Sequence, residues 1–62
     1  RFEAAIEQLE EQDREVVIMR HFEQLSNQDT AQALDLAPAA ASMRYLRALR
    51  KLRKLLGEDV DE

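Results

Sequence analysis

Residues 26–56 read SNQDTAQALDLAPAAASMRYLRALRKLRKLL, and this stretch decides the fold. It begins as a capped helical pattern and breaks over three residues. It then continues as a second helix that is first small and apolar and later densely basic. Two helices joined by a short turn, with cations concentrated on the second, are typical of a helix-turn-helix that binds duplex DNA. The sequence therefore predicts a helix-turn-helix within a small all-α domain.

Local signals set the limits of the first of these helices. Ser26 opens the sequence SNQD, a capping box in which the serine hydroxyl can accept a hydrogen bond from the Asp29 amide. A helix of about nine residues should follow. The break then falls on residues 35–37, with Leu36 as a core residue between the two helices.

The second helix should run from about Pro38 to Leu56. A proline suits the first helical position, because an amide there would have no partner within the helix. Gly57 can end the helix, and residues 57–62 should form an acidic tail. An apolar stripe with helical spacing predicts the buried face: Ala41, Tyr45, Ala48, Leu52 and Leu55, widened by Leu49 and Leu56.

The chain before residue 26 predicts two further helices. Helical spacing links the apolar residues of the first: Phe2, Ala5, Ile6 and Leu9. The polar run EEQDRE at residues 10–15 would place Asp13 on the same face, so we expect a bend near residues 10–12 and a solvated start to the next helix. Without a glycine or proline at the bend, one helix over residues 2–23 stays open. The buried residues of the second helix should be Val16, Val17, Met19 and Phe22.

The net charge of −4 is distributed unevenly. Residues 1–43 carry three cations and nine anions, residues 44–54 carry six cations and no anion, and the last eight residues carry four anions. A polyanion responds to the local field, because salt screens charges beyond about 8 Å. The basic block is therefore the candidate nucleic-acid footprint: Arg44, Arg47, Arg50, Lys51, Arg53 and Lys54.

Residues for catalysis or metal binding are nearly absent. The chain has no cysteine and a single histidine, His21, which excludes a disulfide framework and a zinc site built from these residues. Ser26 and Ser42 have no nearby histidine with an orienting acid, and the only glycine cannot form a phosphate-binding loop. We therefore expect no enzyme activity, no cofactor and no metal. Without a long apolar run or a signal-peptide pattern, we expect a cytoplasmic, nucleoid-associated protein with no membrane partner.

Several spacings match one known family. Residues 14–17 read REVV, residues 25–26 read LS, and residues 29–34 fit the pattern E-I-A-x-x-L as DTAQAL. In the basic helix, an arginine, an arginine-alanine pair and a leucine-arginine pair recur at the family's intervals: Arg44, Arg47-Ala48 and Leu52-Arg53. Over about residues 4–56 the chain resembles region 4 of sigma-70 family transcription initiation factors, most closely the extracytoplasmic-function group. The resemblance implies a four-helix domain of the winged-helix-like class, without a wing.

The resemblance also implies a function in transcription initiation. Residues carried over to the major groove of the −35 promoter element are Ala40, Ser42, Met43, Arg44 and Arg47. Arg50, Lys51 and Lys54 would meet phosphate or the polymerase, which positions the domain without specifying sequence. The implied partners are double-stranded promoter DNA, the β flap of the RNA polymerase core and an anti-sigma factor.

The sequence departs from the family pattern at two places. The usual glycine after Leu34 is Asp35, and the usual G-T-V-K-S at residues 39–43 is AAASM. Alanines can touch thymine methyl groups but cannot make bidentate hydrogen bonds to bases.

Three alternatives stay open at this point. A LuxR-type response-regulator domain shares the four-helix plan and the R-E-V opening, although the spacing of the basic helix favours a sigma factor. A protein-interaction bundle would bind no DNA. Arg44 and Arg47 could then pair within the domain with Glu15, Glu23 or Asp29, and Tyr45 would lie at the core edge. A basic amphipathic helix could also bind a membrane surface or a calmodulin-like partner.

Overall fold

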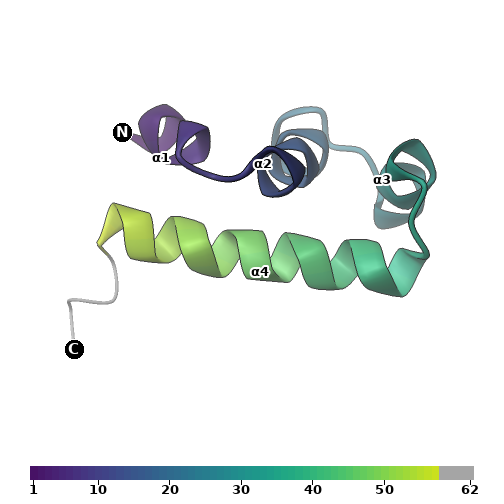
Figure 1. Ribbon diagram of the computed structural model, residues 1–62. Coiled ribbons are helices and arrows are strands. Elements are labelled where there is room, and N and C mark those ends of the chain that lie inside the picture. The colour runs from purple at the N-terminus through teal and green to yellow at the C-terminus, as the bar shows by residue number, and fades with distance from the viewer. Residues whose placement is uncertain (58–62) are drawn as a thin grey trace.

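The computed structural model describes residues 1–57, and within this range it contains four α-helices, one π-helical turn and no strand. Three short helices lie along one side of the long α4 (Pro38–Leu56), as Figure 1 shows: α1 (Phe2–Glu7), α2 (Glu11–Val17) and α3 (Asn27–Leu34). The π-helical turn η1 (Ile18–Phe22) continues α2 directly. The predicted all-α fold with a helix-turn-helix and no wing is confirmed over the described residues.

The helix-turn-helix forms through the local signals of the sequence. The Asp29 amide donates to the Ser26 hydroxyl at 3.0 Å, which caps α3 as predicted. The helix ends at Asp35, whose backbone is left-handed with φ 59°. The Leu36 amide then donates to the Ala31 carbonyl at 2.8 Å, which closes the turn between the two helices.

The limits of α4 are those that the sequence predicts. Pro38 is its first residue, and Gly57 ends it with a left-handed φ of 80°. Such a backbone favours glycine, because a Cβ atom would be strained there. The rest of the expected acidic tail, residues 58–62, lies outside the described residues.

The core lies between α4 and the first two helices. Its buried members are Ala5, Ile6, Leu9, Val16, Val17, Ala48 and Leu52. Three of the residues in the predicted α4 stripe are buried, namely Ala41, Ala48 and Leu52. Leu49 and Leu55 were expected to join them, which is wrong, because they are 38% and 43% exposed. Leu49 lies at the edge of the stripe, and Leu55 lines a shallow groove between α4 and the α1–α2 connection.

The chain bends between α1 and α2 as expected, but at residues 8–10 rather than near residues 10–12, because α2 already begins at Glu11. The expectation that Phe22 is buried is wrong, because its side chain is 50% exposed. At 100° per residue, Phe22 lies about 170° from the midpoint of the buried Val16 and Val17, so helical spacing itself places it on the opposite side. Phe22 is the last residue of η1, in which the Glu23 amide donates to the Ile18 carbonyl five residues earlier at 2.9 Å.

Candidate nucleic-acid interface

The start of α4 is fixed by contacts from the preceding elements. No side chain caps α4 at Ala37. Instead, the Asn27 side-chain amide donates to the Pro38 carbonyl at 2.9 Å, and the Arg20 guanidinium donates to the Asn27 side-chain oxygen at 3.3 Å. The same guanidinium lies 4.6 Å from the ring centroid of Tyr45, within the range of a cation–π contact. These contacts join η1, α3 and α4, and they set the position from which α4 extends.

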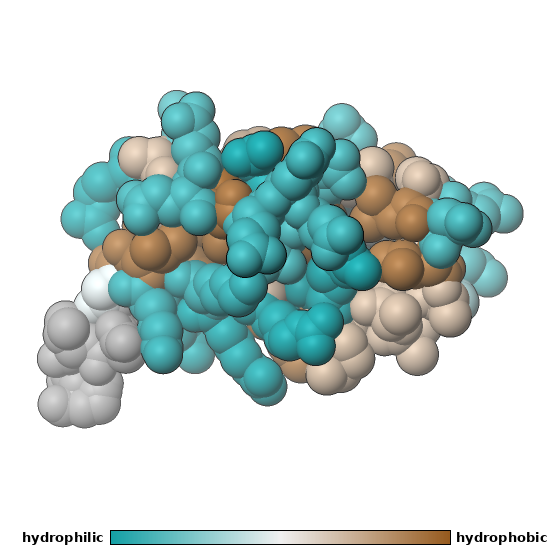
Figure 2. Space-filling view, in the orientation of Figure 1, coloured by the Kyte–Doolittle hydropathy of each residue, from teal (hydrophilic) through white to brown (hydrophobic). Residues whose placement is uncertain are grey.

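One face of α4 points away from the rest of the domain. At about 100° per residue, five exposed residues fall within an arc of about 80° on the side opposite the buried stripe. We call this face the outer row: Ala40, Met43, Arg47, Arg50 and Lys54. The row begins with apolar side chains near the start of the helix and becomes basic from Arg47 onward. Figure 2 shows moderately apolar atoms at the N-terminal end of α4 and hydrophilic atoms along its middle.

The other residues that the sequence singled out lie on different sides of α4. Ser42 is exposed, but it shares its side of the helix with Leu46 and Leu49. The half-buried Arg44 and the exposed Lys51 flank the outer row on the side away from Ser42. We call these two residues the inner margin. Ser42 therefore stands apart, whereas the other six predicted DNA-binding residues fall within an arc of about 120°.

Lys51 faces α2 and has a partner there. Its ammonium nitrogen lies 2.6 Å from a carboxylate oxygen of Asp13. Among residues 1–57 this is the only salt bridge formed. The hydrogen bond and then the charge of Asp13 raise the pKa of Lys51 above its ordinary value of 10.5. Asp13 is only 9% exposed, so the expectation that the whole EEQDRE run is solvated is wrong at this position. The paired lysine lets a carboxylate lie close to the core.

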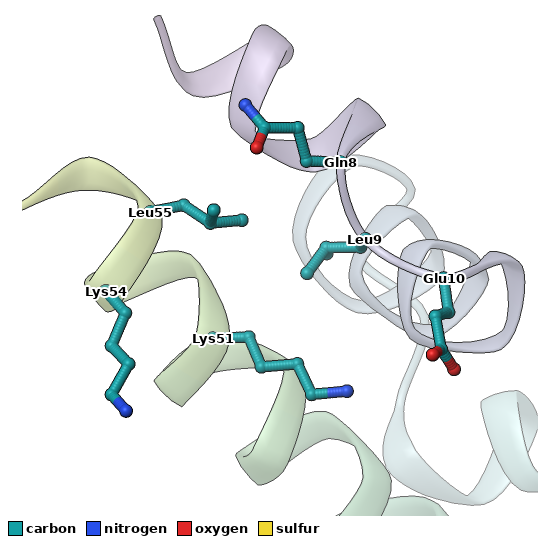
Figure 3. Close-up of a pocket in the computed structure, with 6 residues that line it drawn as sticks. All are labelled: Gln8, Leu9, Glu10, Lys51, Lys54 and Leu55. Carbon is teal, nitrogen blue, oxygen red and sulfur yellow. The ribbon is translucent and has the colours of Figure 1, made fainter.

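Figure 3 shows the neighbourhood of this pair, a shallow groove of about 320 Å³ between α4 and the α1–α2 connection. Leu9 and Leu55 point toward one another across the groove, and Lys51 extends toward the side of Glu10. Lys54 also lines the groove, but its ammonium points away from Leu9 and Leu55. Two lysines three residues apart thus have different surroundings, one against α2 and one in solvent.

The remaining cations that concern the interface have no internal anion. Within the part of the chain that the structure describes, no side-chain hydrogen bond or ion pair involves Arg44, Arg47, Arg50 or Lys54. The alternative in which Arg44 and Arg47 pair with Glu15, Glu23 or Asp29 is therefore not formed in residues 1–57. Tyr45 is half-buried beneath Arg20, which confirms its place at the core edge. The outer row consequently presents three cations that are available to an external anion.

A second surface was missed by reasoning from the sequence. α1, α2 and η1 form a groove of about 410 Å³, lined by Glu3, Ile6, Glu7, Arg14, Ile18 and Phe22. Phe22 also packs in an aromatic cluster, with its ring centroid 6.0 Å from Phe2 and 4.9 Å from His21. The signal was present in VVIMRHF, which holds more apolar residues than one helical face can bury.

Within residues 1–57, no three histidine, aspartate or glutamate side chains lie where they could hold a metal ion. The same residues contain no helix with the length and apolarity needed to cross a bilayer.

Comparison with known proteins decides between the families that share this plan. Residues 1–52 match the family model described as Sigma-70, region 4. The chain belongs to the sigma-70 region 4 family. This region 4 domain is 41% identical over 49 residues to a protein of Streptomyces coelicolor named RNA polymerase sigma-E factor. No solved structure matches the chain significantly.

The family assignment fixes the general role of the chain. It supports a DNA-binding function in a sigma factor and sets aside the LuxR-type alternative, and the family is not a known enzyme family. The match to the Streptomyces protein covers 77% of this chain but only 28% of that relative. The chain thus spans less than a third of the relative that it matches.

Proposed function

We propose that this domain binds the −35 element of a promoter during transcription initiation, with α4 lying in the major groove. The observation that carries the proposal is the outer row, in which three cations without internal partners continue from the exposed start of the second helix of a helix-turn-helix. Such a helix enters the major groove with its N-terminal residues toward the bases. Its first turns then meet base edges, and its later turns meet the backbone.

The residues of the interface divide by position along and around α4. Ala40 and Met43 face the bases from the first two turns. Arg47, Arg50 and Lys54 neutralise phosphates, a contact that supplies affinity without sequence information. The exposed Ser42 and the half-buried Arg44 lie on either side of this row, where they can reach the backbone at the groove edges.

Lys51 has a different assignment in this proposal. Its bond to Asp13 directs the ammonium toward α2, so it contributes to the positive field of α4 and holds the helix in place. The bond also means that one of the six cations in the basic block is partly neutralised before DNA arrives. Only the cations of the outer row are counted here as direct phosphate ligands.

The groove of α1, α2 and η1 is the surface that we propose for the β flap of RNA polymerase. Ile6 and Ile18 lie at its base, and Phe22 exposes half of its side chain beside them. An exposed aromatic residue beside an apolar groove is typical of a protein interface. The groove and the outer row lie on different elements, so DNA and polymerase can be bound together. An anti-sigma factor that covered either surface would block initiation.

Salt dependence provides the test of DNA binding. The natural protein that carries this domain, assembled with core RNA polymerase, should bind promoter duplexes with an affinity that falls steeply as salt rises. Replacing Arg47, Arg50 and Lys54 together by alanine should make the slope shallower by about three, one unit for each cation lost. The matched control is Leu46→Ala, another exposed position of α4, for which the slope should stay unchanged.

A protein-interaction bundle without DNA binding is the competing function, and the apolar groove is the observation that favours it. It predicts that polymerase or another protein binds while the affinity for duplex DNA is absent or independent of salt. That result would refute the DNA-binding proposal.

A further inference from the structure

The start of the outer row has an unusual chemical character for a surface that faces bases. In the first two turns of α4 the outer row consists of Ala40 and Met43, with the exposed Ala39 beside them, and the Met43 side chain is 48% exposed. None of these side chains carries a hydrogen-bond donor, and only the weakly accepting sulfur of methionine departs from pure hydrocarbon. The pale, moderately apolar surface at this end of the molecule is visible in Figure 2.

The polar side chains of the same turns are directed elsewhere. With 100° between successive residues, Ser42 lies about 130° and Arg44 about 70° from the midpoint of Ala40 and Met43. Arg44 is also half-buried on the side of the inner margin. The first donor on the outer row itself is therefore Arg47, one turn beyond Met43.

Major-groove chemistry offers one counterpart to such a surface. Guanine, adenine and cytosine present only hydrogen-bond donors and acceptors at their groove edges, whereas thymine also presents its C5-methyl group. An alanine or methionine against a donor or acceptor would displace water without replacing its hydrogen bond, which is unfavourable. Against a methyl group the same side chains bury apolar area, which is favourable.

We propose that Ala40 and Met43 select thymine at adjacent positions of the bound DNA by apolar contact with its C5-methyl groups. This inference rests on the proposed function, since it requires α4 to lie in the major groove. Sequence preference then comes from the first two turns of α4, and affinity comes from the cations of the later turns. The absence of bidentate donors on the outer row before Arg47 makes methyl recognition the main source of discrimination there.

Replacing thymine by deoxyuracil tests the proposal, because the change removes the C5-methyl group and leaves base pairing intact. Duplexes would first be selected by the polymerase-bound protein from a pool randomised at the −35 position. Each thymine of the best duplex would then be replaced in turn, and binding measured by fluorescence anisotropy at fixed salt. We expect one or two positions at which deoxyuracil weakens binding about fourfold, the value of burying one methyl group.

Variants assign this effect to residues. Met43→Ala should weaken binding to the thymine duplex and abolish the difference between thymine and deoxyuracil at one position. Leu46→Ala is the matched control, because Leu46 is 44% exposed on the same helix but lies off the outer row. It should retain the full fourfold difference. Met43→Gln should change the selected base at that position toward adenine, which glutamine can bind through two hydrogen bonds.

The outcomes separate this inference from the proposed function. If deoxyuracil changes nothing while binding stays salt-dependent, methyl recognition is refuted and DNA binding stands. A fourfold effect that persists in Met43→Ala and in Ala40→Gly would refute the assignment to these residues. If no duplex binds in a salt-dependent way, both proposals fail.

Discussion

The outer row and the inner margin of α4 carry side chains of the same charge in different surroundings. Arg47 lies on the outer row and has no anionic partner within the described residues, whereas Lys51, one turn later, is bonded to Asp13 at 2.6 Å. Arg47 can bind phosphate without breaking an existing contact, whereas Lys51 would first have to give up its bond to the Asp13 carboxylate. Charge density along a sequence therefore overstates the number of cations that a helix can offer to DNA.

Replacing Arg47 and Lys51 by alanine, each in a separate variant, tests this comparison most directly. Arg47→Ala should weaken DNA binding about tenfold, the value of one charge-assisted hydrogen bond, and leave the melting temperature unchanged. Lys51→Ala should do the reverse, lowering the melting temperature and changing affinity little. Anisotropy titrations and thermal melts followed by circular dichroism give both quantities. Equal losses of DNA affinity in the two variants would contradict the claim that Arg47 binds phosphate and Lys51 does not.

Removing the Asp13 carboxylate should change Lys51 from an internally paired cation into one that can bind phosphate. In Asp13→Asn the ammonium loses its charged partner and becomes available to phosphate, so DNA binding should tighten and its salt slope should steepen by about one. Glu10→Gln is the control, because Glu10 also raises the pKa of Lys51 but makes no hydrogen bond to it. It removes the same charge and should have the smaller effect.

The same variant has a signature at alkaline pH. Asp13 raises the folded-state pKa of Lys51 above 10.5, so the stabilising effect of the pair is complete below that pH and is lost as pH rises through the raised value. Chemical denaturation as a function of pH should show this loss in the natural sequence. The loss should be absent in Asp13→Asn, and its persistence there would show that another group is responsible.

The smallest expected effect is a change in stability from substitutions in the turns on either side of α3. Asp35 has a left-handed backbone with φ 59°, as does Gln24 before α3. Asp35→Gly should stabilise the fold by about 0.5 kcal/mol without altering which cations bind DNA. Gln24→Gly should gain more, because aspartate tolerates this conformation better than glutamine. Denaturant midpoints would measure both changes, and a lower midpoint in either variant would contradict the prediction.

The parts of the fold that the sequence predicts are those that short-range signals determine. Ser26, Pro38 and Gly57 act on backbone groups within four residues of themselves, so the limits of α3 and α4 follow from the sequence. The π-helical turn does not follow from the sequence, since no residue type marks it.

The candidate site was predictable in its charge but not in its arrangement. Helical spacing identifies the cations of α4, but a helical wheel places Arg47 and Lys51 only about 40° apart. It cannot show that Asp13, 38 residues earlier in the chain, lies opposite Lys51. The link from Arg20 through Asn27 to the Pro38 carbonyl is likewise a tertiary contact. Placing these partners requires the packing of α2 and α3 against α4.

The length of α4 has a mechanical consequence. This helix runs the whole length of the domain, and α1, α2 and α3 all pack against it (Figure 1). Its 19 residues form a rod of about 28 Å. A tilt of a few degrees at one end displaces the other end by an ångström or two, comparable to the tolerance of a base contact. In the binding mode proposed above, a displacement of α1 and α2 that tilts α4 would therefore shift Ala40 and Met43 relative to the bases.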